Sequence, residues 1–170
     1  MKQLLLNGKW EMEGAGYRCD GTIPGSVYSF LLDNNLIPDP FYRENELQLT
    51  YLLENDFTFR RNFDFQPDGN RVLLRCEGLD TVCDVSINGQ AVGHTENMHR
   101  TYEWDVTELL RQGENEIVVC CLSPLKYMAE LDAIDPLYNS TDTSWGYLHI
   151  RKAHCMMGWD WGPRLPDAGI

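Results

Sequence analysis

The sequence is poor in cationic residues. Its 170 residues include 14 Lys and Arg against 26 Asp and Glu, so the formal net charge at pH 7 is -12. Nucleic acids and anionic membranes bind proteins through clusters of Lys and Arg. The charge balance therefore argues against nucleic acid and membrane as partners, while a neutral or cationic ligand stays compatible with it.

Long apolar segments are also missing. No apolar run approaches the ~18 residues that a membrane-spanning helix needs. The opening, MKQLLLNGKW, has one Lys and three Leu before the polar pair Asn7-Gly8, which is too short an apolar stretch for a secretory signal. We therefore expect a cytoplasmic protein.

Patterns typical of disulfide frameworks and metal sites are absent as well. The six cysteines form no C-x-x-C pair, and the adjacent Cys120 and Cys121 would point to opposite faces of a strand. In a protein without an export signal, buried free thiols are expected rather than disulfides. The four histidines show no ligand spacing with cysteines or acids. The sequence thus predicts no metal and no cofactor.

What the sequence does contain is a series of short β-like runs separated by turn residues. Asn88-Gly89 lies between two apolar-rich runs, which is the strongest short-range signal for a β-hairpin. In the run 82–87, Cys83, Val85 and Ile87 share one face, as in a half-buried strand. The segment 113–122 is apolar on both faces and predicts a central strand. In 56–65 the phenylalanines alternate with an apparent shift at Arg60-Arg61, which predicts a β-bulge.

Helical signals are few. Ser26 is a candidate N-cap for a short helix that stops at Asn34-Asn35, and 105–113 predicts a single helical turn. The acidic stretch 130–144 is interpreted as a solvated loop. Many short strands with turns every 8 to 12 residues predict an all-β fold, a jelly-roll β-sandwich with one or two short helices, formed by residues 1–170 as a single domain.

Three segments resemble one known family. YEWDVTELLRQGENEIVV is similar to a strand-turn-strand hallmark of the N-terminal, galactose-binding-like jelly roll of family 2 glycoside hydrolases. WEMEGAGYRCDGTIPGSVYSFLLDNNLIPDPFYRENE resembles the β-mannosidase branch, and IRKAHCMMGWDWGPRLPDAGI resembles the segment that separates this branch from β-galactosidases and β-glucuronidases. The resemblance covers essentially the whole chain. It departs at Met156-Met157, where members of the branch usually have an aromatic residue.

The resemblance implies a piece of a longer enzyme. A full member is an exo-acting, retaining glycosidase that removes terminal, non-reducing β-D-mannose, and its catalytic carboxylates belong to a downstream (β/α)₈ barrel. This chain would then hold no catalytic residue, would be inactive alone, and could end before the last strand of the jelly roll. The family's general acid belongs to an Asn-Glu pair, but Asn45-Glu46 lies in a polar loop and Asn115-Glu116 opens a buried strand. The implied partners are a mannose-containing oligosaccharide and the barrel.

The motif Gly-Trp-Asp-Trp-Gly at 158–162 has the chemistry of a sugar contact. An indole covers the apolar face of a pyranose, and a carboxylate accepts hydrogen bonds from adjacent hydroxyls. By resemblance, Asp160 and Trp159 hold the terminal mannose, and Arg151 is a third candidate for substrate binding. We expect Asp160 toward the ligand, Trp159 at the rim and Trp161 packed inward.

Structural alternatives exist for each of these residues. A W-x-W pair in a β-sandwich is often core packing, and Asp160 could instead form a salt bridge with Arg151 or Arg164. Arg151 could equally be solvated or structural. The other three tryptophans, Trp10, Trp104 and Trp145, are assigned to packing. Two further functions stay open: a stand-alone carbohydrate-binding module, and another family 2 glycosidase such as a β-galactosidase or β-glucuronidase.

Overall fold

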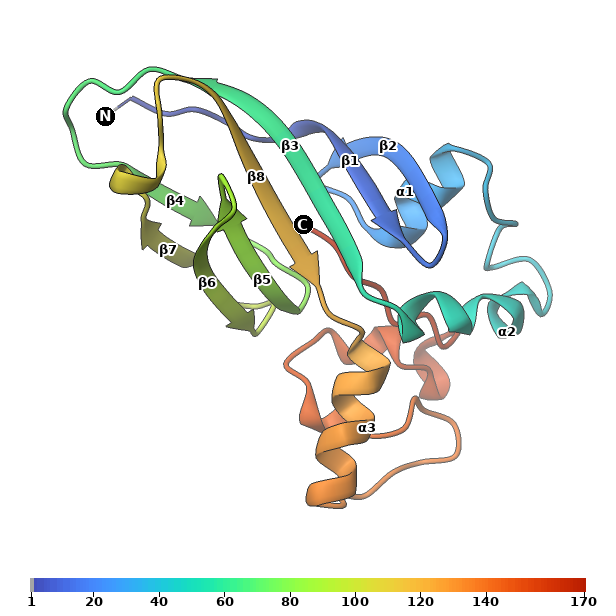
Figure 1. Cartoon of the computed structure of the whole chain (residues 1–170). Coiled ribbons are helices and arrows are strands. Elements are labelled where there is room, and N and C mark those ends of the chain that lie inside the picture. The colour runs from blue at the N-terminus through green and yellow to red at the C-terminus, as the bar shows by residue number, and fades with distance from the viewer. Residues whose placement is uncertain (1) are drawn as a thin grey trace.

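The computed structural model describes residues 2–170 and is built mainly of antiparallel strands (Figure 1). Six strands form one sheet in the order β2-β1-β3-β8-β5-β6, and two more form a second sheet, β4-β7. The strands are β1 (Gly8–Gly14), β2 (Tyr17–Ile23), β3 (Phe57–Phe65), β4 (Leu73–Cys76), β5 (Val82–Ile87), β6 (Gln90–Glu96), β7 (Tyr102–Asp105) and β8 (Gly113–Cys121). The all-β jelly-roll prediction is confirmed.

The strand predictions largely hold. Asn88 and Gly89 both have positive φ (52° and 76°) and close the β5–β6 hairpin, as the type I′ turn requires. Strand β8 lies between β3 and β5 and is central, as expected. The bulge predicted at Arg60-Arg61 is wrong, because β3 pairs with β8 in unbroken register from Phe57 to Phe65. The four phenylalanines of β3 have the same parity, so no shift was needed. The register shift lies instead at Val85/Ser86, between β5 and β6.

Helices cluster outside the long sheet (Figure 1). Helix α1 (Val27–Asp33) begins at the predicted cap: the Ser26 side chain accepts a hydrogen bond from the Ser29 N–H, and the Ser29 hydroxyl lies 2.7 Å from the Ser26 amide nitrogen. The predicted turn near 107 is a 3₁₀ helix, Thr107–Leu109. Two helices were not predicted, α2 (Asn45–Leu49) and α3 (Pro124–Ile134). Further 3₁₀ turns cover Thr50–Glu54, Tyr147–His149, His154–Met156 and Trp159–Trp161.

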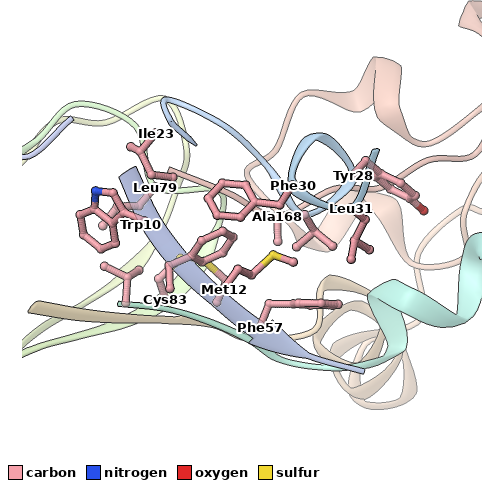
Figure 2. Packing of buried hydrophobic residues seen from close by; sticks show 14 of the residues in the cluster. Trp10, Met12, Ile23, Tyr28, Phe30, Leu31, Phe57, Leu79, Cys83 and Ala168 are labelled. Atoms are coloured by element: carbon pink, nitrogen blue, oxygen red, sulfur yellow. The ribbon is translucent and has the colours of Figure 1, made fainter. Parts of the chain in front are cut away.

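The main hydrophobic core lies on one face of the six-stranded sheet, under α1 (Figure 2). Phe30 of α1 meets Phe59 of β3 edge to face, with ring centroids 5.3 Å apart. Gly21 of β2 is required beneath this ring, because a Cβ there would lie 2.5 Å from Phe30. Trp10 is 4% exposed and belongs to this core, and Trp104 is partly buried against it, so packing is confirmed for both.

A second, smaller core joins α3 to the segment that carries the motif. Its buried members are Val82, Met128, Tyr147, Ile150 and Met157. The acidic stretch predicted as loop is helical in its first part, because α3 extends to Ile134. From this second core the chain returns to the sandwich, ending near the middle of the long sheet (Figure 1). Backbone hydrogen bonds join Gly25 with Ile170 and Asp80 with Gly169.

All six cysteines are free, but only Cys83 and Cys121 are buried and Cys155 is exposed, so the expectation of buried thiols holds for two of them. Among the helices of residues 2–170, none has the length and apolar character needed to cross a membrane.

Candidate functional site

The motif forms a short turn that projects from the second core. Trp159–Trp161 is one 3₁₀ turn, and it lies between Gly158 (φ 95°) and Gly162 (φ 154°). A Cβ at Gly158 would lie 2.6 Å from the carbonyl oxygen of Asp142, so glycine is required where the two segments meet. Trp159 itself has φ 61°, which is unusual for a bulky residue.

The two indoles of this turn are exposed and in contact. Trp159 is 52% exposed and Trp161 50%, and their rings meet edge to face with centroids 4.8 Å apart. The prediction that Trp161 packs inward is wrong. That prediction assumed strand alternation, whereas a 3₁₀ turn has about three residues per turn and does not place neighbours on opposite faces.

Asp160 separates the two tryptophans in the sequence and is exposed. Within residues 2–170, Asp160 forms no salt bridge with Arg151 or Arg164. The Arg164 side chain donates instead to the Thr141 carbonyl oxygen (3.0 Å). Arg151 pairs through its backbone with Asn97 and Met98. Both carboxylate oxygens of Asp160 are therefore available as hydrogen-bond acceptors.

Backbone hydrogen bonds join the turn to residues 142–144. The Trp159 N–H donates to the Asp142 carbonyl (2.6 Å), and the Ser144 N–H donates to the Met157 carbonyl (2.8 Å). Met157 is 0% exposed and fills the second core, so here a methionine anchors the position where an aromatic residue is usual. The turn is thus attached to packed structure on its N-terminal side.

Arg151 is exposed, and no contact within residues 2–170 brings it to Asp160. Its backbone carbonyl accepts from the Met98 N–H (3.1 Å), which ties this segment to the loop after β6. The neighbouring Lys152 behaves differently: its side chain is 0% exposed and forms an ion pair with Asp80. Sequence reasoning missed this pair, because nothing in H-I-R-K-A-H indicates which cation is buried.

A partly buried carboxyl group, Asp167, lies between the motif and the chain's last residues. It accepts hydrogen bonds from the backbone N–H groups of Ala168 (2.8 Å) and Tyr28 (3.3 Å). Burial raises the pKa of Asp167 to about 6, although these hydrogen bonds and the charge of Lys152 act in the opposite direction. This carboxyl group connects the C-terminal segment to the start of α1.

Asp132, near the end of α3, is a second carboxylate that sequence reasoning did not single out. It accepts from the Leu137 N–H (3.2 Å), the Asn139 amide (3.2 Å) and the Trp145 indole (2.6 Å). The backbone hydrogen bond from Leu137 and the side-chain donors lower the pKa of Asp132. Trp145 itself is 63% exposed, so its assignment to packing is wrong.

Fold and turn together define a galactose-binding-like jelly roll that presents two indoles and a free carboxylate to solvent. The family model described as "Glycosyl hydrolase 2 galactose-binding domain-like" matches residues 10–170. The chain belongs to this family.

Two of the curated relatives and one solved structure that the chain resembles are β-mannosidases. The chain is 33% identical over 97% of its length to a probable beta-mannosidase of Caenorhabditis elegans, and 33% identical over 98% to the beta-mannosidase of Capra hircus. The crystal structure of a beta-D-mannosidase from Dictyoglomus thermophilum superposes with a TM-score of 0.92, at 36% identity over 99% of this chain. The chain spans 20% of the length of the first two proteins and 22% of the third.

Proposed function

We propose that the chain is the N-terminal jelly-roll domain of an exo-acting, retaining β-mannosidase that hydrolyses terminal, non-reducing β-D-mannose. In this proposal the domain forms one wall of the mannose pocket and carries no catalytic carboxylate. A downstream (β/α)₈ barrel of the same polypeptide supplies the nucleophile and the acid/base, which in retaining enzymes are about 5–5.5 Å apart. The similarity to β-mannosidases over nearly the whole chain supports this assignment.

The observation that carries the proposal is the exposed carboxylate of Asp160 on the same short turn as two half-exposed indoles. An ionised carboxylate can accept hydrogen bonds from two adjacent hydroxyls of a hexose, while Trp159 covers the apolar face of the ring. A sugar with a different hydroxyl arrangement leaves part of the carboxylate unpaired in the closed pocket, which costs about 1–3 kcal/mol. This would give the wall its preference for mannose, whose 2-hydroxyl is axial.

Arg151 is the third substrate-binding residue of the proposal. Within residues 2–170 its exposed side chain forms no salt bridge or hydrogen bond, so its N–H groups are available to donate to a sugar hydroxyl. We also propose that the protein is cytoplasmic. Its six free thiols support this location, because the cytoplasm is a reducing compartment.

The test uses the full-length enzyme with Asp160→Ala and Asp160→Asn, assayed on nitrophenyl β-mannoside. Each charge-assisted hydrogen bond contributes about 1.5–3 kcal/mol, so losing two lowers kcat/KM by roughly 10²-fold or more. Asp64→Ala removes an exposed carboxylate from β3 and serves as the matched control. The melting temperature should stay unchanged in all three variants.

Two results would contradict the proposal. Turnover of Asp160→Ala within twofold of the parent excludes substrate contact, and a lowered melting temperature with normal turnover makes the turn a packing element. Residues 1–170 alone should show no hydrolysis, and activity of this piece would refute the placement of the catalytic groups. An isolated chain that binds mannosides but has no catalytic partner would instead indicate a stand-alone binding module.

A further inference from the structure

Trp145 combines two properties that rarely occur together, an exposed ring and a fixed orientation. The side chain is 63% exposed, yet its indole Nε1 lies 2.6 Å from Oδ2 of Asp132. Hydrogen bonds to an ionised acceptor are short and about twice as strong as neutral ones. The ring is therefore held in place with its face toward solvent, without being part of a core.

The acceptor that holds the ring is itself held firmly. The Asp132 side chain is 9% exposed, and its other oxygen accepts from the Leu137 N–H and the Asn139 amide. The Asn139 carbonyl oxygen in turn accepts from the Gly146 N–H (2.6 Å), directly after Trp145. His149 Nε2 lies 3.3 Å from Oδ1 of Asp132. Besides the indole, three groups thus face one buried carboxylate, and two of them donate hydrogen bonds to it.

Trp145 is joined to the turn that carries the proposed mannose site by a short backbone ladder. Asp142–Ser144 pairs with Met157–Trp159 through the two backbone hydrogen bonds described above and the Thr143–Gly158 bridge. Trp145 follows directly after one end of this short ladder, and Trp159 stands at its other end. Three residue steps correspond to roughly 10 Å along the ladder, so the two indoles offer separate surfaces.

We propose that Trp145 is an aromatic platform for the sugar on the leaving-group side of the scissile bond, a pyranose unit of a β-linked mannose oligosaccharide. This inference rests on the proposed function, in which Asp160 and Trp159 hold the terminal mannose. A pre-oriented indole loses little conformational freedom when a pyranose stacks on it.

The test compares two substrates in the full-length enzyme: β-linked mannobiose, whose leaving group is a sugar, and methyl β-mannoside, whose leaving group has no ring. Trp145→Ala should lower kcat/KM for mannobiose about tenfold, the scale of one lost ring contact, and leave methyl mannoside within twofold of the parent. Phe41→Ala, which removes a 73% exposed ring near α2, is the control and should change neither value.

Two further variants separate stacking from folding. Trp145→Phe keeps a flat ring without the N–H and should recover part of the mannobiose activity. Asp132→Asn keeps the shape of the acceptor but weakens the hold on the indole, and should lower mannobiose turnover alone. If Trp145→Ala has a reduced melting temperature, the activities of Trp145→Phe and Asp132→Asn decide whether the indole stacks on the sugar.

The outcomes are distinct. Equal losses on both substrates, or no loss on mannobiose, would overturn the platform, since the ring would then pack against the rest of the polypeptide or do nothing. Asp160→Ala should lower both activities equally. If Asp160→Ala has no effect, the proposed mannose contact of Asp160 is wrong. A loss of activity confined to mannobiose in Trp145→Ala would still support the platform.

Discussion

Gly158→Ala tests whether the turn that carries Asp160 is held in one geometry by close backbone packing. The residue has φ 95°, and a side chain in such a strained conformation costs about 1–3 kcal/mol. The added Cβ would lie 2.6 Å from the Asp142 carbonyl oxygen, so the hydrogen bond from the Trp159 N–H to that oxygen must break or stretch. Together with a lost hydrogen bond of about 0.5–1.5 kcal/mol, the substitution should cost about 1.5–4.5 kcal/mol.

The assay is urea unfolding of the chain, with kcat/KM of the full-length enzyme measured in parallel. Gly69→Ala is the matched control, because Gly69 has φ 79° but no atom within 4 Å of an added Cβ. Gly69→Ala should lower the free energy of unfolding by roughly 1–2 kcal/mol, the cost of the left-handed backbone conformation alone, and should leave kcat/KM unchanged. Gly158→Ala should also lower kcat/KM at least tenfold, since a displacement of about 1 Å can cost 10²-fold in rate. Equal destabilisation by both substitutions would refute the close-packing argument.

The remaining predictions concern the stability contributions of two ionisable side chains, Lys152 and Asp167. Lys152→Met leaves Asp80 without its cation and should lower the free energy of unfolding by about 3–5 kcal/mol, whereas Lys9→Met, from an exposed pair with Asp20, should change it by less than about 1 kcal/mol; urea unfolding decides. Asp167 has its folded-state pKa raised to about 6, above the unfolded value of ~3.9, so its stabilising contribution is full below about pH 4 and is lost as pH rises through 6. The stability of Asp167→Asn relative to the parent should therefore increase between pH 4 and pH 7, and a flat difference would contradict the raised pKa.

The parts of the fold that sequence reasoning predicted are those that local chemistry determines. An Asn-Gly pair needs no tertiary information to form a tight hairpin, and Ser26 satisfies the first amides of α1 through residues within one turn of it. The central position of β8 follows from apolar residues on both faces. These features depend on neighbours only a few positions away in sequence.

Not every missed part lacked a local signal. Helix α3 begins after Ser123, whose side chain accepts a hydrogen bond from the Lys126 N–H, and has Pro124 in its first turn, which is a helix-start pattern visible in the sequence. Other missed parts depend on contacts that the sequence does not display. Trp145 was assigned to packing because large aromatics usually are buried, but the group that fixes it is a carboxylate 13 residues away. The inward orientation of Trp161 failed for a related reason, because strand alternation was applied to a 3₁₀ turn.

The position of Asp160 between two separate anchors explains how an exposed residue can be selective. Before the turn, Met157 is buried in the second core; after it, Leu165 and Ala168 are buried in the main core. The intervening residues must cross the surface between these anchors, and Gly158 removes the side chain that would prevent the closest approach. The cost of ordering the turn is then met by folding rather than by sugar binding. In the proposed mannose pocket, a carboxylate on a backbone held in this way would discriminate between hydroxyl arrangements, because the turn does not shift to compensate for a missing partner.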